Sequence, residues 1–461
     1  MNHEPTHQQR ALIEALARFC SKEASPTGVF LLNGYAGTGK TSVVGALVQA
    51  LALVRRDVVL LAPTGRAAKV LSRFSGRQAY TIHRKIYQGD IMSGGRSMNL
   101  AGNPHRNAVF IVDEASMIGD SSGDGNDSLL DDLVQYVYGY GDNCRMILLG
   151  DTAQLPPVGC DRSPAMSPAV LRGMGLKVTR AVLTATVRQA SESGILYNST
   201  RLRTIMAESL AKNPEGSLPV PDLRFDSFPD VSVTTAQDLQ DDLSTAYSTY
   251  GIDNTIVITR SNRRAMLFNL AIRSQILDRE SYIERGEPLL IAKNNYHWAA
   301  KVRRGEFIAN GDIATINTIY GYENRGFLRF ADVSLSFADR DLTIDCKLIL
   351  NSLNSETTAL TAEHEQMLLN LALQGATPEQ LNDPYKRTRI LKADPYYNAL
   401  RVKYAYTLTC HKSQGGQWDS VFIDMAGISD EATRTLDFYR WLYTAITRAT
   451  TRLTFITDPR D

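Results

Sequence analysis

The first residues that could do chemistry form a glycine-rich segment, GYAGTGKT, which runs from Gly34 to Thr41 and matches the pattern GxxxxGK[ST]. An apolar run precedes this segment and a helical stretch follows it. In this context glycines let backbone N–H groups turn toward phosphate oxygens, Lys40 supplies a positive charge, and the Thr41 hydroxyl can coordinate Mg²⁺. We therefore predict a nucleotide phosphate site made by Gly34, Gly37, Thr38, Gly39, Lys40 and Thr41.

A pair of acids stands at the end of a later apolar run, in the segment IVDEASM. Asp113 can hold Mg²⁺, and Glu114 can orient and deprotonate an attacking water molecule. Alone, the pair would fit a solvated strand end equally well, but after a phosphate loop we favour the chemical interpretation. A further apolar run ends in LLGDTAQLPPVG, which brings Asp151 and Gln154 to the same predicted sheet edge, where α/β proteins bind ligands. Gln154 can accept and donate hydrogen bonds, so it suits the sensing of a γ-phosphate.

Apolar runs alternate with helical stretches over the first 190 residues, which predicts a parallel sheet with helical crossovers. A second series of runs indicates another α/β unit. It is interrupted from Pro288 to Lys403, where short β-like runs predict a small barrel and a helix follows from Thr361 to Gln374. The predicted strands are Val29–Asn33, Val58–Ala62, Ala108–Asp113, Arg145–Asp151 and Leu176–Leu183, then Thr255–Thr259, Ala405–Cys410, Ser420–Met425 and Arg452–Thr457, and in the barrel Phe307–Tyr320, Gly326–Phe330 and Leu342–Leu350.

Composition and charge narrow the class of protein. The chain has 461 residues, enough for about three domain-sized units. With 50 Lys and Arg against 49 Asp and Glu, any affinity for nucleic acid must come from a local basic surface. The five cysteines form no CxxC pair, which is typical of reduced thiols. The N-terminal residues lack the apolar core of a signal peptide, and no apolar run approaches the roughly 18 residues of a membrane span, so we expect a cytoplasmic protein without membrane contact.

Six segments occur in order, namely the phosphate loop, DEASM, GDTAQLPPVG, LTATVRQ, CHKSQG and LYTAITRA. With them the chain resembles superfamily 1B helicases of the Dda and RecD-like group, from THQQRA at Thr6 to ITRA ending at Ala449. The resemblance implies an α/β fold with two RecA-like P-loop motor domains, a β-hairpin insertion in the first and a small SH3-like β-barrel insertion in the second. It implies boundaries of 1–190 for motor domain 1 with a hairpin at about 87–103, 191–287 and 404–461 for motor domain 2, and 288–403 for the barrel-like insertion with its helical segment.

The same resemblance assigns further roles. Arg188 in LTATVRQ and Arg448 in LYTAITRA correspond to arginines that bind nucleotide and stabilise the transferred phosphoryl group, although each arginine alone would be read as surface. Either Gln8 or Gln9 corresponds to an adenine-reading glutamine, and the doubled glutamine leaves the choice open. Gly415 corresponds to a residue that couples the strand to the nucleotide. The implied nucleic-acid contacts are Pro63, Thr64, Thr81, His83, Asn262, Thr409, His411 and Lys412.

As a function, the resemblance implies an ATP-dependent, Mg²⁺-dependent DNA helicase. It would move 5′ to 3′ on single-stranded DNA and unwind tailed duplex DNA as a monomeric motor, with protein partners in replication or repair. Two alternatives stay open. An RNA-directed helicase would use the same motor contacts, because these address backbone and bases and do not identify the sugar. A motor or regulatory subunit of a larger nuclease or repair complex would also keep the nucleotide site.

Three other segments have weaker signals. Tyr87 to Asn103 contains a Gly-Gly turn suited to a hairpin, which the resemblance implies is a strand-separating pin; its apex has no aromatic residue, so a steric wedge is expected rather than a stacking one. Tyr385 to Tyr404 interleaves basic and tyrosine side chains, as single-strand binders do, but we favour a solvated helix edge and a barrel strand. The acidic stretch from Gly119 to Asp132 lacks EF-hand spacing, so we expect a polar loop before a helix.

Overall fold

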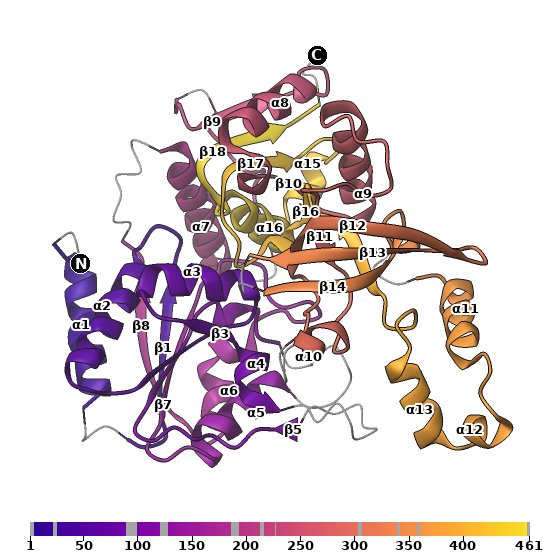
Figure 1. Cartoon of the computed structure of the whole chain (residues 1–461). Helices are drawn as coiled ribbons and strands as arrows, with labels where there is room; N and C mark the ends of the chain where they lie inside the picture. The colour runs from indigo at the N-terminus through magenta and orange to yellow at the C-terminus, as the bar shows by residue number, and fades with distance from the viewer. Residues whose placement is uncertain are drawn as a thin grey trace. The chain divides into compact units, whose positions relative to one another are not determined.

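The computed structural model describes residues 4–21, 25–88, 99–119, 128–185, 193–212, 216–225, 227–302, 307–338, 342–356 and 360–458. The chain forms two compact units. The first comprises residues 1–87, 100–239 and 413–461, and the second comprises residues 88–99 and 240–412. Figure 1 follows the helices and strands along the chain. The proposed boundaries of the motor domains remain a prediction.

The first unit contains a six-stranded sheet in the order β3-β2-β6-β7-β1-β8, in which the neighbouring strands are parallel. Each of the five apolar runs predicted for this region forms a strand, so the predicted parallel sheet is confirmed. The short edge strand β3 was not predicted, because three residues are too few to show a period. The strands are β1 (Gly28–Gly34), β2 (Val58–Ala62), β3 (Ala79–Thr81), β6 (Val109–Val112), β7 (Arg145–Gly150) and β8 (Lys177–Leu183).

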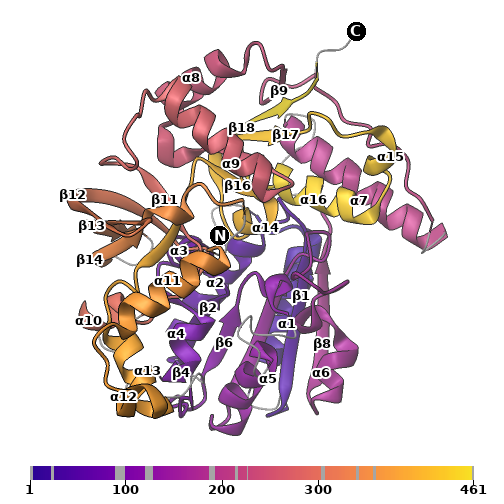
Figure 2. The ribbon, with the colours of Figure 1, turned by 90° about the vertical axis from the view of Figure 1, so that its right-hand side faces the viewer.

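Alternate residues of these strands bury opposite faces of the sheet, as the two-residue period of a strand requires. Phe30 and Leu32 pack into a core with α1 (His7–Phe19), α2 (Lys40–Leu53) and α3 (Gly65–Ser75). Val29 and Leu31 pack into a second core with α4 (Ile82–Ile86), α5 (Leu129–Val134) and α6 (Pro168–Gly173). Figure 2 shows the side of the sheet with α5 and α6. The helix predicted to follow the acidic stretch is present as α5, but it begins at Leu129, within the stretch from Gly119 to Asp132 that was expected to be a loop. Residues 120–127 lie outside the described part.

A second group of parallel strands in the first unit has β18 between β17 and β9. Helix α16 accompanies it and is buried along most of its length, because its sequence supplies Phe438, Tyr439, Trp441 and Leu442 to the interior. The bounds are β9 (Val231–Thr234), β17 (Trp418–Asp424), β18 (Ala449–Ile456), α7 (Gly194–Lys212), α15 (Asp430–Thr433) and α16 (Leu436–Ile446), with the shorter turns η1 (Ala115–Met117), η2 (Gln135–Gly139) and η3 (Pro164–Met166).

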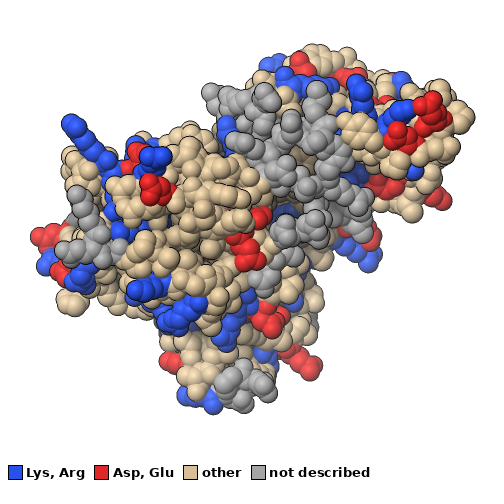
Figure 3. Space-filling view, turned by 90° about the horizontal axis from the view of Figure 1, so that it is seen from below, with Lys and Arg blue, Asp and Glu red and all other residues tan. Residues whose placement is uncertain are grey.

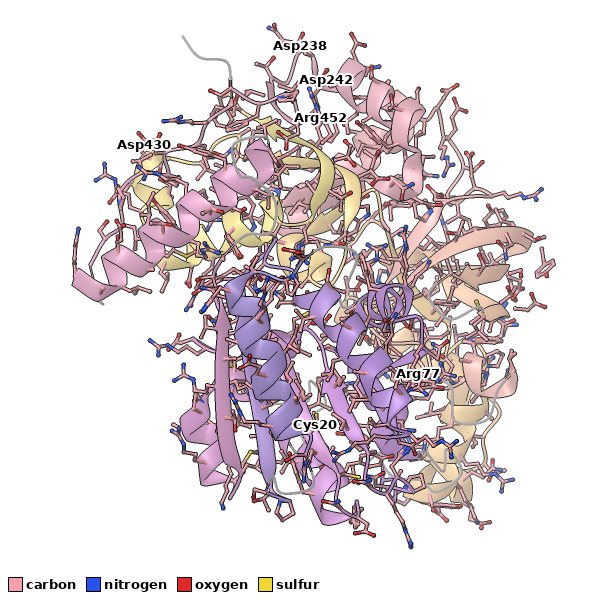
Figure 4. All side chains as sticks on the ribbon, turned by 90° about the vertical axis from the view of Figure 1, so that its left-hand side faces the viewer. Cys20, Arg77, Asp238, Asp242, Asp430 and Arg452 are labelled. Carbon is pink, nitrogen blue, oxygen red and sulfur yellow. The ribbon has the colours of Figure 1, made fainter. Side chains whose placement is uncertain are left out.

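Side chains form hydrogen bonds with backbone groups at both ends of α1. At the start, the Thr6 hydroxyl accepts from Gln9 N and the Gln9 amide oxygen accepts from Thr6 N, which is a capping box. The helix ends beside Cys20, which is labelled in Figure 4, and two arginines donate hydrogen bonds to the last carbonyl oxygens. Arg145 donates to Phe19 O at 2.8 Å and Arg56 donates to Cys20 O. Cations there also suit the negative end of the helix dipole.

The second unit contains the parallel pair β10 and β16 and a closed barrel, β11-β12-β13-β14-β15. The barrel confirms the barrel-like insertion expected from the apolar runs. The strands are β10 (Thr255–Thr259), β11 (Pro288–Ile291), β12 (Ile313–Arg325), β13 (Leu328–Phe337), β14 (Leu342–Ile349), β15 (Leu400–Tyr404) and β16 (Thr407–Thr409). The helices are α8 (Leu239–Tyr250), α9 (Asn262–Ala271), α10 (Trp298–Val302), α11 (Ala362–Leu373), α12 (Pro378–Asn382), α13 (Pro384–Ala393) and α14 (Cys410–Ser413), with η4 (Ile252–Asn254), η5 (Ile272–Ile276) and η6 (Leu350–Ser352).

Four predicted strand limits in the barrel are wrong. Strand β12 continues past Tyr320 to Arg325, and β13 continues past Phe330 to Phe337. Strand β12 does not begin at Phe307, because Gly311, with φ +95°, turns the chain before Ile313. The run predicted to begin at Gly326 begins in a turn, because Gly326 has φ +61° and joins β12 to β13. Both glycines occupy the left-handed region that other residues rarely adopt, so the turns take precedence over the apolar pattern.

The basic and tyrosine-rich segment forms α13 and β15, which is the alternative favoured from the sequence. Several of its side chains make contacts inside the unit. Arg401 pairs with Glu365, and Tyr396 donates to Glu323 at 2.8 Å. Helix α11 packs against barrel residues through Leu368. These contacts account for Tyr396 and Arg401 without nucleic acid.

The predicted hairpin is described at its base alone. Strands β4 (Tyr87–Gln88) and β5 (Asn99–Leu100) form a two-stranded sheet, as the turn signal between them predicts. Residues 89–98, which include the predicted apex, lie outside the described residues. Among the helices that are described, each is too short or too polar to cross a bilayer.

Candidate nucleotide site and strand-contacting residues

The phosphate loop joins β1 to α2, as its sequence context predicts. Gly37 and Gly39 have φ values of +75° and +80°, which bend the backbone into the turn before the helix. The Lys40 ammonium group donates to Gly34 O. A Cβ atom on Gly34 would lie 2.5 Å from Cγ of Lys40, so only glycine leaves room for this lysine. The loop therefore holds Lys40 and the first N–H groups of α2 at one place, where they can bind phosphate oxygens.

The two N-terminal glutamines have different positions. Gln9 is buried, and its Nε2 donates to Thr38 O in the phosphate loop at 3.2 Å. Gln8 Nε2 donates to the Thr184 hydroxyl at the end of β8, and its Oε1 accepts from the N–H groups of Thr184 and Ala185. Gln9 thus contacts the loop directly and Gln8 lies beside it. Which of them reads adenine stays a prediction.

The acid pair lies at the end of β6. Strand β7 separates β6 from β1, the strand that precedes the phosphate loop. Asp113 Oδ1 accepts from Glu114 N at 2.9 Å. Glu114 has φ +52°, a left-handed conformation that costs about 1 kcal/mol for a residue with a side chain and is concentrated at functional sites. Burial, and then the charge of Glu114, raises the pKa of Asp113 to about 6, while Lys40 opposes this shift.

These residues fit Mg²⁺. A partly buried carboxylate whose pKa is raised by desolvation gains from a divalent cation, which stabilises the charged form. Thr41 lies in the first turn of α2 and adds a hydroxyl oxygen. Mg²⁺ in phosphate-binding proteins usually takes one or two protein oxygens and completes its shell with phosphate and water. A set of one carboxylate and one hydroxyl is therefore sufficient.

Gln154 lies in the loop after β7. The residue is 5% exposed, and its Oε1 finds no hydrogen-bond partner among the described residues. A buried amide oxygen without a partner costs about 1–3 kcal/mol, so it is expected to meet a ligand or water. This observation agrees with a role in sensing bound phosphate. Asp151, at the start of the same loop, is fully buried.

Arg448 is buried, and its guanidinium group donates to Thr444 O, Gly416 O and the Thr447 hydroxyl. In this state it is held by the protein rather than directed at a phosphate. Nearby, Gly415 has φ +73°, and a Cβ atom there would lie 2.9 Å from Cβ of Ala67 in α3. The glycine therefore permits a close approach to α3. Arg188 lies outside the described residues.

The predicted strand contacts fall into two sets, one in each unit. In the first unit, Thr64 caps α3 by accepting from Ala67 N, and Thr81 caps α4 by accepting from Arg84 N. The register pairs Ala62 of β2 with Thr81, so Pro63 and Thr64 lie at the same sheet edge as Thr81. His83 follows in α4.

In the second unit, Asn262, Thr409 and Lys412 line one cavity between α9, β16 and the root of the barrel. Lys412 donates to Asn310 Oδ1 at 2.6 Å, and burial lowers its pKa. His411 is its neighbour in α14.

Three residues near these sites have no individual signal in the sequence. Lys403 lines the same cavity as Lys412, and burial lowers its pKa to about 8. Arg203 of α7 lies over the ring of Tyr35 in the phosphate loop, 4.3 Å from its centroid. Tyr443 of α16 reaches both the phosphate loop and Asp151. Tyr443 lies in the recognised segment LYTAITRA, and Lys403 lies in the basic and tyrosine-rich segment from Tyr385 to Tyr404. These segments are the signals that could have found the two residues.

Comparison with known proteins gives consistent matches. Residues 5–211 match the family described as AAA domain, and residues 404–456 match the UvrD-like helicase C-terminal domain. The ATP-dependent RecD2 DNA helicase of Deinococcus radiodurans is 35% identical over 128 residues, which are 28% of this chain and 16% of that protein. The ATP-dependent DNA helicase dda of Enterobacteria phage T4 is 31% identical over 135 residues, which are 28% of each chain.

Among solved structures, Pif1 helicase from Bacteroides in complex with ADP-AlF3 and ssDNA has a TM-score of 0.48 and 15% identity, covering 99% of this chain and 93% of that one. The matched regions amount to between about one sixth and just over a quarter of the two helicase relatives' own lengths. The sequence matches coincide with the phosphate loop, the acid pair and the Gln154 loop at one end, and with the Arg448 segment at the other. Over these regions the chain is similar to superfamily 1B helicases of the Dda and RecD-like group.

Proposed function

We propose that this protein is an ATP-dependent DNA helicase that moves 5′ to 3′ along single-stranded DNA and unwinds tailed duplex DNA. The observation that carries the proposal lies within the first unit. A complete phosphate loop, a partly buried acid pair at the end of β6 and the amide oxygen of Gln154, which has no partner among the described residues, occur there together. These are the groups that phosphoryl transfer requires for binding, metal coordination, activation of water and sensing of the γ-phosphate.

In this proposal Lys40 and the loop N–H groups bind the phosphates of ATP, and Thr41 and Asp113 hold Mg²⁺. Glu114 accepts the proton of the attacking water. Gln154 contacts the γ-phosphate and its water. Arg448 and Arg188 supply positive charge in the transition state, which requires Arg448 to exchange its carbonyl partners for phosphate oxygens. Gln9, or Gln8 beside it, contacts the adenine.

The DNA strand would contact both sets of predicted residues, Pro63, Thr64, Thr81 and His83 in the first unit and Asn262, Thr409, His411 and Lys412 in the second. Lys412 and Lys403, which line the same cavity, support contact with the strand in the second unit. Burial disfavours the charged form of each ammonium group, and a nearby phosphate would stabilise that form. The 5′ to 3′ direction is supported by the likeness of LTATVRQ and CHKSQGGQWDSVFI to the 1B branch. We further propose a monomeric, cytoplasmic motor that works with replication or repair proteins.

A strand-displacement assay tests these statements. The purified chain is given ATP, Mg²⁺ and duplexes of one sequence that have a 5′ tail, a 3′ tail or an RNA tail, with Lys40→Ala as the inactive control. We expect unwinding of the duplex with a 5′ DNA tail. Unwinding of the 3′-tailed duplex alone would show the direction to be wrong. Preference for the RNA tail would favour an RNA-directed helicase, and ATP hydrolysis without unwinding would favour a subunit of a larger complex.

A further inference from the structure

Tyr443 of α16 connects two loops of the nucleotide site. Its hydroxyl oxygen accepts from Ala36 N in the phosphate loop at 3.0 Å, and its hydroxyl donates to Asp151 Oδ2 at 2.7 Å. Tyr443 is 1% exposed and Asp151 is fully buried. Helix α16 is labelled in Figures 1 and 2. One hydroxyl group therefore joins the loop that would bind phosphate to the loop that carries Gln154.

The residues around this bond hold the same loop. Leu155 N donates to the Thr444 hydroxyl at 2.8 Å, and Leu155 O accepts from Gln414 Nε2 at 2.8 Å. Asp151 and Leu155 are thus both hydrogen-bonded to α16, and Leu155 is also hydrogen-bonded to Gln414, just before β17. Gln154 stands between these two fixed points. Its position toward a bound phosphate depends on them.

The bond to Asp151 is also energetically important. A fully buried carboxylate is costly unless donors surround it, and the donors to Asp151 are the Tyr443 hydroxyl and Ala153 N, at 3.0 Å. Burial, and then the charge of Asp151, raises the pKa of Tyr443 well above its ordinary value. The hydroxyl therefore keeps its proton, which it donates to Asp151, and its oxygen remains the acceptor for Ala36.

We propose that Tyr443 is a positioning residue for ATP hydrolysis, whose hydroxyl holds the phosphate loop and the Gln154 loop in the arrangement that the reaction needs. The inference rests on the proposed function. Tyr443 does not touch the reacting atoms. It acts through Ala36 and through Asp151, so its loss should slow the chemical step more than it weakens nucleotide binding.

A matched control lies on the same helix. Tyr439, one turn earlier, is equally buried, but its hydroxyl donates to Pro219 O at 2.9 Å and contacts neither loop. Tyr443→Phe and Tyr439→Phe each remove one buried hydroxyl group and keep the ring. A purely structural contribution would therefore affect the two variants alike.

The experiment measures DNA-stimulated ATP hydrolysis and thermal unfolding of the whole chain. We expect Tyr443→Phe to lower kcat by about tenfold or more, the usual effect of losing a hydrogen bond to a charged group, while KM for ATP changes less than about threefold. Tyr439→Phe should change neither constant by more than about threefold, although both variants should unfold at somewhat lower temperature. Equal effects of the two variants on kcat would overturn the inference.

Asp151→Asn provides a second, independent line. If the bond between Tyr443 and Asp151 carries the effect, the double variant Tyr443→Phe, Asp151→Asn should lose about as much kcat as the more severe single variant. Fully multiplicative losses would contradict the inference. If the wild-type chain hydrolyses ATP and Tyr443→Phe is unaffected, only this inference is refuted. If the wild-type chain hydrolyses no ATP, the proposed function is refuted and the inference with it.

Discussion

At the scale of single residues, Asp113 is a carboxyl group whose burial opposes its own ionisation. Its pKa is raised to about 6 from an ordinary value of 3.8, chiefly by desolvation and then by Glu114. Glu114 itself is held at φ +52°. Both features oppose folding, and both occur at the residues for which we propose metal binding and water activation. Such local costs are common at sites that are arranged for a ligand.

The first prediction concerns stability and pH. Because the pKa of Asp113 is higher in the folded than in the unfolded chain, the folded state binds more protons between about pH 4 and 6, and the free energy of unfolding falls as pH rises through this window. Asp113→Asn removes this dependence. Without Mg²⁺, we expect the free energy of unfolding of the variant to exceed that of the wild type by about 1–3 kcal/mol above pH 7. Near pH 4 the two values should differ little. Urea unfolding measures this.

The exposed residue Asp253 provides the control for that measurement, because Asp253→Asn also removes one carboxyl group. If Asp113→Asn raises the free energy of unfolding by the same amount at pH 4 and pH 7, titration of Asp113 is not the cause of the increase.

The second prediction separates binding from chemistry. Lys40→Ala removes the charge that the phosphate loop places at the phosphates, so it should weaken ATP binding and stop turnover. Glu114→Gln keeps the shape but removes the base, so turnover should fall by about a hundredfold or more while the Kd for ATP stays within about threefold. Calorimetric titration and steady-state kinetics measure these effects. Turnover of Glu114→Gln at the wild-type rate would mean that the general base is another group.

At the scale of elements, the sheet brings distant loops to one edge. Strands β1, β6 and β7 lie within one parallel sheet, so the phosphate loop, the acid pair and the Gln154 loop follow the carboxyl ends of their strands together. Helix α16 then adds Tyr443 and Thr444 to the same loops. The base of the β4–β5 hairpin is a separate element, and we predict that the hairpin acts on the duplex rather than on the nucleotide.

The third prediction tests that hairpin. Separating a base pair needs a few kcal/mol per step, and a protrusion in the path of the strand would let translocation supply it. Replacing residues 92–98 by a short Gly-Ser link should leave DNA-stimulated ATP hydrolysis unchanged and lower the rate of strand separation. A Gly-Ser link of the original length in place of the same residues controls for composition. Unwinding at the original rate by the shortened protein would exclude a pin.

At the scale of the whole molecule, charge is nearly balanced, with a net value of +1. On the face seen in Figure 3, basic and acidic side chains are intermingled and form no single basic field. Because the net charge gives no general attraction to a polyanion, affinity for a strand should come from local contacts in each unit. This is what a motor requires, because a strand must be released as well as held, and the nucleotide must change the affinity.

The fourth prediction follows from that coupling. The Kd for single-stranded DNA should differ by about fivefold or more between the nucleotide-free protein and Glu114→Gln saturated with ATP and Mg²⁺. Fluorescence anisotropy with a labelled oligonucleotide measures the difference. Lys40→Ala under the same conditions should show no difference, because it binds ATP poorly. Equal affinities in the two states of Glu114→Gln would contradict a motor that alternates its grip.

The sequence by itself determined the parts of this protein that depend on neighbouring residues. The GxxxxGK[ST] loop, the acid pair after an apolar run and the alternation of strands with helices are local patterns, and each of them occurs in the structure as expected. The barrel was also predicted, but both limits of β12 and of β13 were not. The two starts follow turns at Gly311 and Gly326, which depend on backbone conformation rather than on apolarity.

Only the tertiary structure decided which distant groups meet. Tyr443 is 407 residues from Ala36 and 292 from Asp151, so no local pattern could pair them. The different partners of Gln8 and Gln9, the burial that raises the pKa of Asp113 and the carbonyl partners of Arg448 depend on the packed interior in the same way. The physical reason is that desolvation and side-chain hydrogen bonds arise when the chain folds back on itself, whereas propensity and periodicity act along a few neighbouring residues.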